Sequence, residues 1–363
     1  MTVQNKTGEL EANKANTASK ISYTLNSWAV DNTNKKSYIV RQYDENWNKL
    51  NSDKVATTDD YKYRFVRSTP VNPNATDANK LYRTAFAQDP EYETTTAAAG
   101  NYNQMASNAS MTLSPTFGND HPQYCNENTF KVTAQNQDQT TRVVLGVKMS
   151  APGTTTYDED LYTINGNKEV VYTKASLAER LKKILLNEPD VKTWADAHTN
   201  VSLDITFNED AAGKTTIKKA TLKGKTAASA ADDTFAGTFT TDFDKALPNI
   251  VRYKGGVAYY AVRIKHFGDT EGTPWNVAGQ GVTAGGNSLI YPNPSAGASD
   301  GWFLGRYGVV RNNWYDISVN TIQTLGDATI PALSDNPDDV LENYISVSIN
   351  VLSWSKHTQG ADL

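Results

Sequence analysis

The sequence predicts a protein built mostly of β-strands, and three observations carry this prediction. The chain of 363 residues contains 19 Tyr, 10 Phe and 7 Trp beside abundant Thr, Val and Asn, a composition that favours pleated strands joined by turns. Several segments alternate apolar and polar residues with the period of two that is typical of strands. One segment alone has the spacing of an amphipathic helix. With 38% hydrophobic residues, the chain can bury one large core or two modest ones.

The predicted strands follow from alternation and from density of β-branched residues. In residues 345–352, Ile345, Val347, Ile349 and Val351 share one face, while Leu352 and Trp354 switch to the other face, as a bulge or bend would require. Residues 253–267 read as a hairpin arm that turns at Gly255 and Gly256, and residues 44–114 read as long surface loops. The predicted strands are 21–30, 37–43 (forming a hairpin with 21–30), 140–149, 201–207, 215–222, 234–241, 305–310 and 314–325, besides 345–352.

The one predicted helix covers residues 176–186. Leu177, Leu181, Ile184 and Leu185 fall on one stripe of it, which is the pattern of a helix packed on a core. Ser176 followed three residues later by Glu179 fits a capping box at its start. Asn187 and Pro189 end it.

Charge and cysteine content exclude several classes of function. The 35 Lys and Arg stand against 40 Asp and Glu, which gives a net charge of −5 and no electrostatic reason to expect nucleic acid as a partner. Cys125 is the only cysteine, so there is no internal disulfide and no cysteine-based zinc site. No stretch approaches the ~20 apolar residues of a membrane-spanning helix, and the first twenty residues are polar rather than signal-like.

Motifs for metal binding and catalysis are weak. His121, His198, His266 and His357 are scattered without metal-ligand spacing, and we expect surface or strand-end positions for them. The acidic clusters 158–160 and 338–339 read as solvated turns, because 158–167 lacks the glycine and terminal glutamate of a calcium loop. The glycine-rich segment 279–286 lacks the flanking strand and helix of a phosphate cradle.

Two alternative functions remain open on the residues alone. Residues 297–301 match the G-x-S-x-G pattern of serine hydrolases, with Ser299 as nucleophile and His357 downstream, although prolines precede the motif where a buried strand is needed. A carbohydrate-binding or other adhesive module could use Trp275 and Trp302 as stacking platforms. Aromatic residues on strands more often pack a core, and that is our interpretation of Trp275, Trp302, Trp314 and Tyr315.

Longer segments resemble a known family. The segments are LNSWAVDNTNKKSYIVR at 25–41, YCNENTF and QTTRVVLGVKM at 124–149, YKGGVAYYAVRIKHFGD at 253–269, GRYGVVRNNWYDISVNTIQTLGDATIP at 305–331 and ENYISVSINVLSWSKHTQGADL at 342–363. In order and spacing they resemble the C-terminal part of the Mfa1-like branch of the Bacteroidales fimbrillins, which are the major subunits of type V pili.

The resemblance implies a fold, a location and partners. The fold is a β-sandwich of the Greek-key or transthyretin-like kind, with one short helix and long loops. The function is that of a structural and adhesive subunit at the cell surface, associated with the outer membrane, with no catalysis, cofactor or metal. The partners are other fimbrial subunits, both further copies and accessory subunits, and host or bacterial surface receptors. The family also implies a lipidated precursor and removal of an N-terminal strand by an arginine-specific protease.

These expectations divide the chain into three parts. Residues 1–20 are a polar N-terminal segment or the remnant of a preceding domain, residues 21–350 are the sandwich with loop insertions, and residues 351–363 are a candidate donor strand. In strand exchange, an extended segment of one subunit completes the open sheet of the next. Within the tail we expect Val351, Leu352, Trp354 and Leu363 to be the polymerisation residues. An ordinary terminal strand is the alternative.

Overall fold

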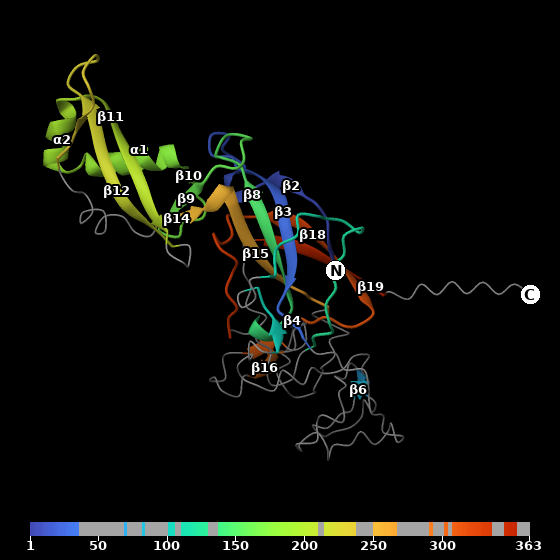
Figure 1. The fold of residues 1–363 in the computed structure, drawn as a ribbon. Helices are drawn as coiled ribbons and strands as arrows, with labels where there is room; N and C mark the ends of the chain where they lie inside the picture. The colour runs from blue at the N-terminus through green and yellow to red at the C-terminus, as the bar shows by residue number, and fades with distance from the viewer. Residues whose placement is uncertain are drawn as a thin grey trace, which may run out of the picture.

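The protein is described from a computed structural model, shown as a ribbon in Figure 1. The structure describes residues 1–35, 69–70, 82–83, 101–105, 110–129, 137–209, 214–236, 250–266, 290–292, 301–303, 307–335 and 345–353. The predicted strand 37–43, most of the predicted loop region 44–114, and Trp354 and Leu363 lie outside these residues. The prediction of a mostly β, sandwich-like protein is confirmed.

Two sheets form the sandwich. The first contains four antiparallel strands in the order β15 (Val257–Arg263), β8 (Arg142–Met149), β3 (Ser22–Asp31) and β2 (Thr7–Glu9). The second has the order β1 (Thr2–Val3), β18 (Asn313–Ile322) and β19 (Ile345–Ser353). β1 runs parallel to β18, and β19 runs antiparallel to it. Strands close in space thus come from the two ends of the described chain.

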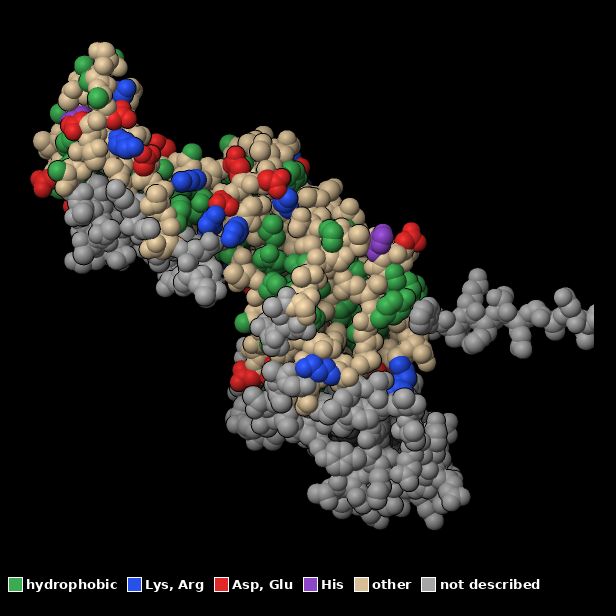
Figure 2. Space-filling view, in the orientation of Figure 1, with side chains coloured by type: hydrophobic (Ala, Val, Ile, Leu, Met, Phe, Trp, Pro, Cys, Tyr) green, Lys and Arg blue, Asp and Glu red, His purple; other side chains and the backbone are tan. Residues whose placement is uncertain are grey.

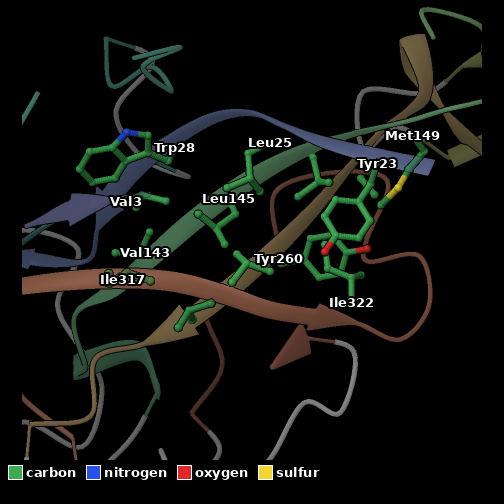
Figure 3. Close-up of a cluster of buried hydrophobic side chains, with 14 of the residues drawn as sticks. Val3, Tyr23, Leu25, Trp28, Val143, Leu145, Met149, Tyr260, Ile317 and Ile322 are labelled. Carbon is green, nitrogen blue, oxygen red and sulfur yellow. The ribbon is translucent and has the colours of Figure 1, made fainter. Parts of the chain in front are cut away.

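The main core lies between these sheets (Figure 3). Trp28 and Leu145 from the first sheet and Ile317 from the second are fully buried. β8 was predicted to be buried on both faces, and all of its residues except Lys148 are buried. Such a strand reads as a continuous apolar run rather than an alternation.

The first twenty residues contribute to this sandwich. They form β1, β2 and the 3-10 helix η1 (Glu11–Asn13), and the side chains of Met1, Val3 and Leu10 are buried in the core. The main-chain N–H of Gln4 also donates to the carbonyl oxygen of Ile317 at 2.9 Å. This segment was expected to be a polar segment or a domain remnant, and in the structure it adds one strand to each sheet of the sandwich.

A lobe with its own core extends from one end of the sandwich (Figure 1 and Figure 2). Its sheet has the order β10 (Tyr172–Thr173), β9 (Leu161–Ile164), β14 (Ile250–Tyr253), β12 (Lys214–Lys225) and β11 (Thr199–Glu209), with β13 (Asp233–Thr234) paired to β12. The helices α1 (Lys174–Leu185) and α2 (Pro189–Asp196) pack on β11. Leu177, Leu181 and Leu185 of α1 are buried, as the predicted stripe requires.

The predicted helix differs in detail from α1, and the second helix, α2, was not predicted. The capping box of α1 joins Thr173 and Ser176, with Ser176 N–H donating to the Thr173 hydroxyl at 3.2 Å, so the predicted box of Ser176 and Glu179 is wrong. A serine at the third helical position can return the hydrogen bond that a glutamate usually supplies. Pro189 ends the first helix as expected but also begins α2, because proline fits the first turn of a helix.

The predicted hairpin at 253–267 is also wrong. β14 pairs with β9 and β12 in the lobe, whereas β15 pairs with β8 in the sandwich. The 3-10 turn η7 (Lys254–Gly256) lies between them, and Gly255 and Gly256 have φ of 56° and 69°. The two glycines therefore carry the chain from one sheet to another instead of folding a strand back on itself.

The remaining described elements are short. They are the pairs β4 (Thr33–Asn34) with β7 (Tyr102–Asn103), β5 (Thr69–Pro70) with β6 (Tyr82–Arg83), and β16 (Ile290–Pro292) with β17 (Gly301–Phe303), and the 3-10 turn η6 (Gln137–Gln139). Of the predicted strand at 305–310, the described residues make only isolated bridges, at Tyr307 and Val309.

Candidate docking edge

Strands β15 and β19 end their respective sheets on the same side of the sandwich. Each has one strand neighbour among the described residues, β8 for β15 and β18 for β19. On the other side of β15, Tyr259 exchanges two main-chain hydrogen bonds with Asp327, so this edge is paired at that residue. An edge strand presents backbone N–H and C=O groups on its unpaired side, which makes it a template for a further strand. We call the region between these two strands the docking edge.

A hollow of about 290 Å³ lies along this docking edge. Its walls are the ends of the two sheets, and its lining is mostly apolar. Past the end of β15, Lys265 forms an isolated antiparallel bridge with Tyr307, and both residues also line the hollow. The lining from the two strands consists of Ala261, Val262, Arg263, Ile345, Val347 and Ile349.

The inward row of β19 is less buried than that of its neighbour β18. Tyr315, Ile317 and Val319 of β18 have exposed fractions of 1%, 0% and 3%. Their cross-strand partners Val351, Ile349 and Val347 pack against the same core but remain half-buried. Because removing apolar surface from water contributes roughly 25 cal/mol per Å², this row favours contact with another apolar segment.

Charge at the docking edge is confined to one end. The guanidinium carbon of Arg263 lies 5.6 Å from the centre of the Tyr307 ring, within the range of a cation–π contact. Lys265 follows two residues later. The rest of the lining is apolar, so a segment that alternates apolar and small polar residues suits the hollow.

The predicted polymerisation residues have different environments. Val351 faces the core opposite Tyr315, and Leu352 lies opposite Trp314 on the outer face with 57% of its surface exposed. The pairing continues through Ser353, so the bulge predicted at Leu352 is absent, and the register shift lies between Val319 and Thr321. Trp354 and Leu363 lie outside the described residues.

The other candidate residues are either aromatic residues packed in the sandwich or lie outside the described residues. Tyr315 is buried, as predicted for a core aromatic residue, and the half-buried Trp314 donates from Nε1 to the Thr2 hydroxyl at 3.0 Å. Ser299, His357, Trp275 and the cluster 338–339 lie outside the described residues, as does the side chain of Trp302.

The acidic cluster 158–160 forms ion pairs rather than a cation site. Asp158 pairs with Lys148, and Asp160 pairs with Arg252 at 2.7 Å. Nowhere in the described part of the chain do three or more His, Cys, Asp or Glu residues gather in a way that could hold a metal ion. Neither described helix is long and apolar enough to cross a membrane.

The two buried or paired histidines and the cysteine have shifted pKa values. Burial lowers the pKa of His266 to about 4 and raises that of Cys125 to about 11, so both are uncharged near neutral pH. The hydrogen bond to the Trp194 carbonyl group and the contact with Asp233 raise the pKa of His198. His121 is exposed, as expected.

Sequence reasoning missed the contribution of β15 and Tyr307 to the docking edge. The alternation at 257–264 indicated a strand, and its burial pattern alternates accordingly. No pattern in the sequence, however, says which strand lies beside it. A local signal therefore identified the element but not the edge it forms.

Comparison with known families matches residues 290–360 to the C-terminal region of fimbrillin, the major fimbrial subunit protein type IV. The matched region contains β16, β17, β18 and β19, and thus one wall of the docking edge. It supports a structural subunit of a fimbria at the cell surface that associates with other pilus subunits. No curated protein matches the chain.

Proposed function

We propose that this chain is a structural subunit of a bacterial surface fimbria, of the Mfa1-like type V kind, and that subunits join by addition of a strand at the docking edge. The observation that carries the proposal is the coincidence of two features in one segment. Residues 345–353 belong to the region that matches fimbrillin, and they form the edge strand with the half-buried apolar row.

The acceptor in this proposal is the space between β19 and β15. A strand entering it would pair with the backbone of β19 and set alternate side chains against Ile345, Val347 and Ile349. Backbone pairing supplies affinity in such strand additions, and pockets for alternate side chains supply specificity. The inward row would then reach the degree of burial seen in β18.

The donor in this proposal is the segment 351–363 of a neighbouring copy. Val351 and Leu352 already pair with β18 in their own sheet, so Trp354 and Leu363 act as the inserted anchors, and the exposed side chain of Leu352 contacts the neighbouring subunit beside them. The same surface serves accessory subunits that carry a similar segment. The assembled fimbria is held at the outer membrane and contributes to adhesion to host or bacterial surfaces, and the subunit itself has no catalytic role.

Shortened chains test the donor. Removal of 354–363 leaves all of β19 in place, whereas removal of 351–363 also takes the Val351 and Leu352 pairings from β18. Both variants are mixed with the full chain, and filaments are counted by electron microscopy after circular dichroism has verified folding. We expect the variant that lacks 354–363 to stay folded. It should end a growing filament wherever its own tail would have to serve as the donor strand. Undiminished filament formation by that deletion excludes the tail as donor.

A pair of substitutions on one strand tests the acceptor. Val347→Asp places a charge on the inward row, and Ser348→Asp places the same charge on the exposed outer face of β19. We expect Val347→Asp alone to lose binding of a synthetic peptide of residues 351–363. Equal binding by both folded variants would exclude the docking edge as acceptor while leaving the fimbrial assignment in place.

A further inference from the structure

The ring of His198 joins Trp194 of α2 to Asp233 of β13 in the lobe. It stacks on the indole of Trp194 with ring centres 4.0 Å apart and planes 20° apart. Only 7% of its side chain is exposed. Polar atoms that are buried to this degree are hydrogen-bonded in folded proteins, so each ring nitrogen is expected to have a partner.

Both ring nitrogens of His198 face oxygen acceptors. Nδ1 lies 2.6 Å from the carbonyl oxygen of Trp194, and Nε2 lies 3.0 Å from Oδ2 of Asp233. A carbonyl group and a carboxylate cannot donate, and a neutral imidazole carries a single N–H. Only the imidazolium form can make both hydrogen bonds.

We propose that His198 is a proton-controlled latch: in its charged form it makes both hydrogen bonds and holds β13 against α2, and in its neutral form it keeps only one of them and this contact loosens. On its other side β13 contacts β12. β13 is two residues long and pairs with β12 through Lys223↔Thr234 and Gly224↔Asp233, and the Phe235 N–H donates to the Leu222 carbonyl oxygen at 3.0 Å.

The latch sits over an aromatic pair that its opening would uncover. The rings of Trp194 and Phe235 meet edge to face with centres 5.7 Å apart, and both pack on the lobe core. Gly224 leaves room for this arrangement. A Cβ atom at Gly224 would lie 2.8 Å from Cβ of His198 and 3.1 Å from the Trp194 ring.

Other charged groups on the surrounding elements are paired among themselves. On α2, Asp196 pairs with Lys192 at 2.8 Å. On β12, Lys223 pairs with Asp204 of β11, and Lys225 lies 3.7 Å from Asp232. Asp233 is therefore the carboxylate that pairs with the charged form of His198. The hydrogen bond from His198 in turn lowers the pKa of Asp233.

The direction of the pH effect follows from the contacts. Hydrogen bonding to the Trp194 carbonyl group, with a further contribution from Asp233, raises the pKa of His198 above its ordinary value of 6.5. The latch is thus fully closed below the ordinary pKa of histidine. It is lost as the pH rises through the higher pKa of the folded protein.

The test is an NMR titration of the full chain labelled at histidine, with Asp233→Asn and Asp232→Asn as a matched pair. We expect His198 to titrate above 6.5, and Asp233→Asn to shift that pKa downward more than Asp232→Asn does. Amide hydrogen exchange at Thr234 and Phe235, corrected for intrinsic pH dependence, should rise through the same pH range.

The His198→Gln variant provides the second readout. A glutamine cannot change charge, so exchange at Thr234 and Phe235 in this variant should no longer depend on the former titration. If His198 titrates at or below 6.5, or if corrected exchange stays constant through its titration, the latch is excluded. If His198→Gln fails to fold, the Asp233→Asn and Asp232→Asn pair decides the same question with substitutions on exposed side chains.

Discussion

The hydroxyl group of Tyr315 lies 2.8 Å from Nδ1 of His266. The hydroxyl oxygen already accepts the Val310 N–H at 2.7 Å, so its own proton is available to the histidine. Burial lowers the pKa of His266 to about 4, which keeps the ring neutral and leaves Nδ1 as an acceptor. The pair thereby ties β18 to the segment that follows β15.

Replacing Tyr315 with Phe should destabilise the sandwich. The change leaves the Val310 N–H and the His266 ring nitrogen without this partner inside the core, at a cost of about 1–3 kcal/mol. The matched variant Tyr260→Phe removes a hydroxyl group that donates to the Thr324 carbonyl oxygen at 2.8 Å and interacts with the Gly326 backbone, and it should cost no more than Tyr315→Phe. Urea denaturation of both variants measures the difference, and a larger loss for Tyr260→Phe would contradict this account.

Acid should weaken the sandwich through His266. The pKa of His266 is about 4 in the folded protein against 6.5 for the ordinary side chain, so the unfolded chain binds the proton more readily. Stability is therefore lost as the pH falls from 6.5 towards 4. We expect His266→Gln to flatten this part of a urea-midpoint profile, and parallel profiles for the two proteins would show that another group is responsible.

The two glycines between β14 and β15 should differ in their tolerance of alanine. Both have positive φ, which costs an alanine about 1–2 kcal/mol. A Cβ atom at Gly255 meets open space, whereas one at Gly256 would lie 2.8 Å from the Met149 carbonyl oxygen. Gly256→Ala should therefore lower the melting temperature more than Gly255→Ala. Thermal unfolding followed by circular dichroism measures both, and equal losses would refute the close approach.

The buried ion pair of Asp31 and Arg142 should be costly to break. The charged atoms lie 2.8 Å apart, and the side chains of Arg142 and Asp31 are 6% and 1% exposed. Asp31→Asn leaves the guanidinium group without its counter-charge, which typically costs about 3–5 kcal/mol. Asp196→Asn breaks an exposed pair on α2 and should change the free energy of unfolding by less than about 1 kcal/mol. Similar urea midpoints for the two variants would contradict the prediction.

Local sequence patterns predicted the strands and the helix better than they predicted which strands lie side by side. The stripe on α1 and the alternation of β19 correspond to helix and strand faces in the structure, because burial of a face depends on the period of the chain alone. The turn at Gly255 and Gly256 was also identified. The passage of the chain from one sheet to another at this turn was not predicted. A pair of glycines shows that the chain turns but not which sheet each flanking strand joins.

The docking edge was predicted only in part for the same reason. The apolar row of β19 is visible in the sequence, and three residues of that row line the hollow. Its opposite wall comes from β15, more than 80 residues earlier in the chain. The distinction between a strand that serves its own sheet and one that serves another subunit depends on such distant partners, so alternation alone could not make it.

Leu161 and Tyr253 are cross-strand partners at the base of the lobe, and both side chains are buried in the sandwich core. The lobe therefore leaves and re-enters the sandwich through two adjacent strands. A pulling force applied to the sandwich between β1 and β19 is therefore not transmitted through the lobe. Residues between these two anchors can accordingly change in length or composition while the mechanical path of the molecule stays the same.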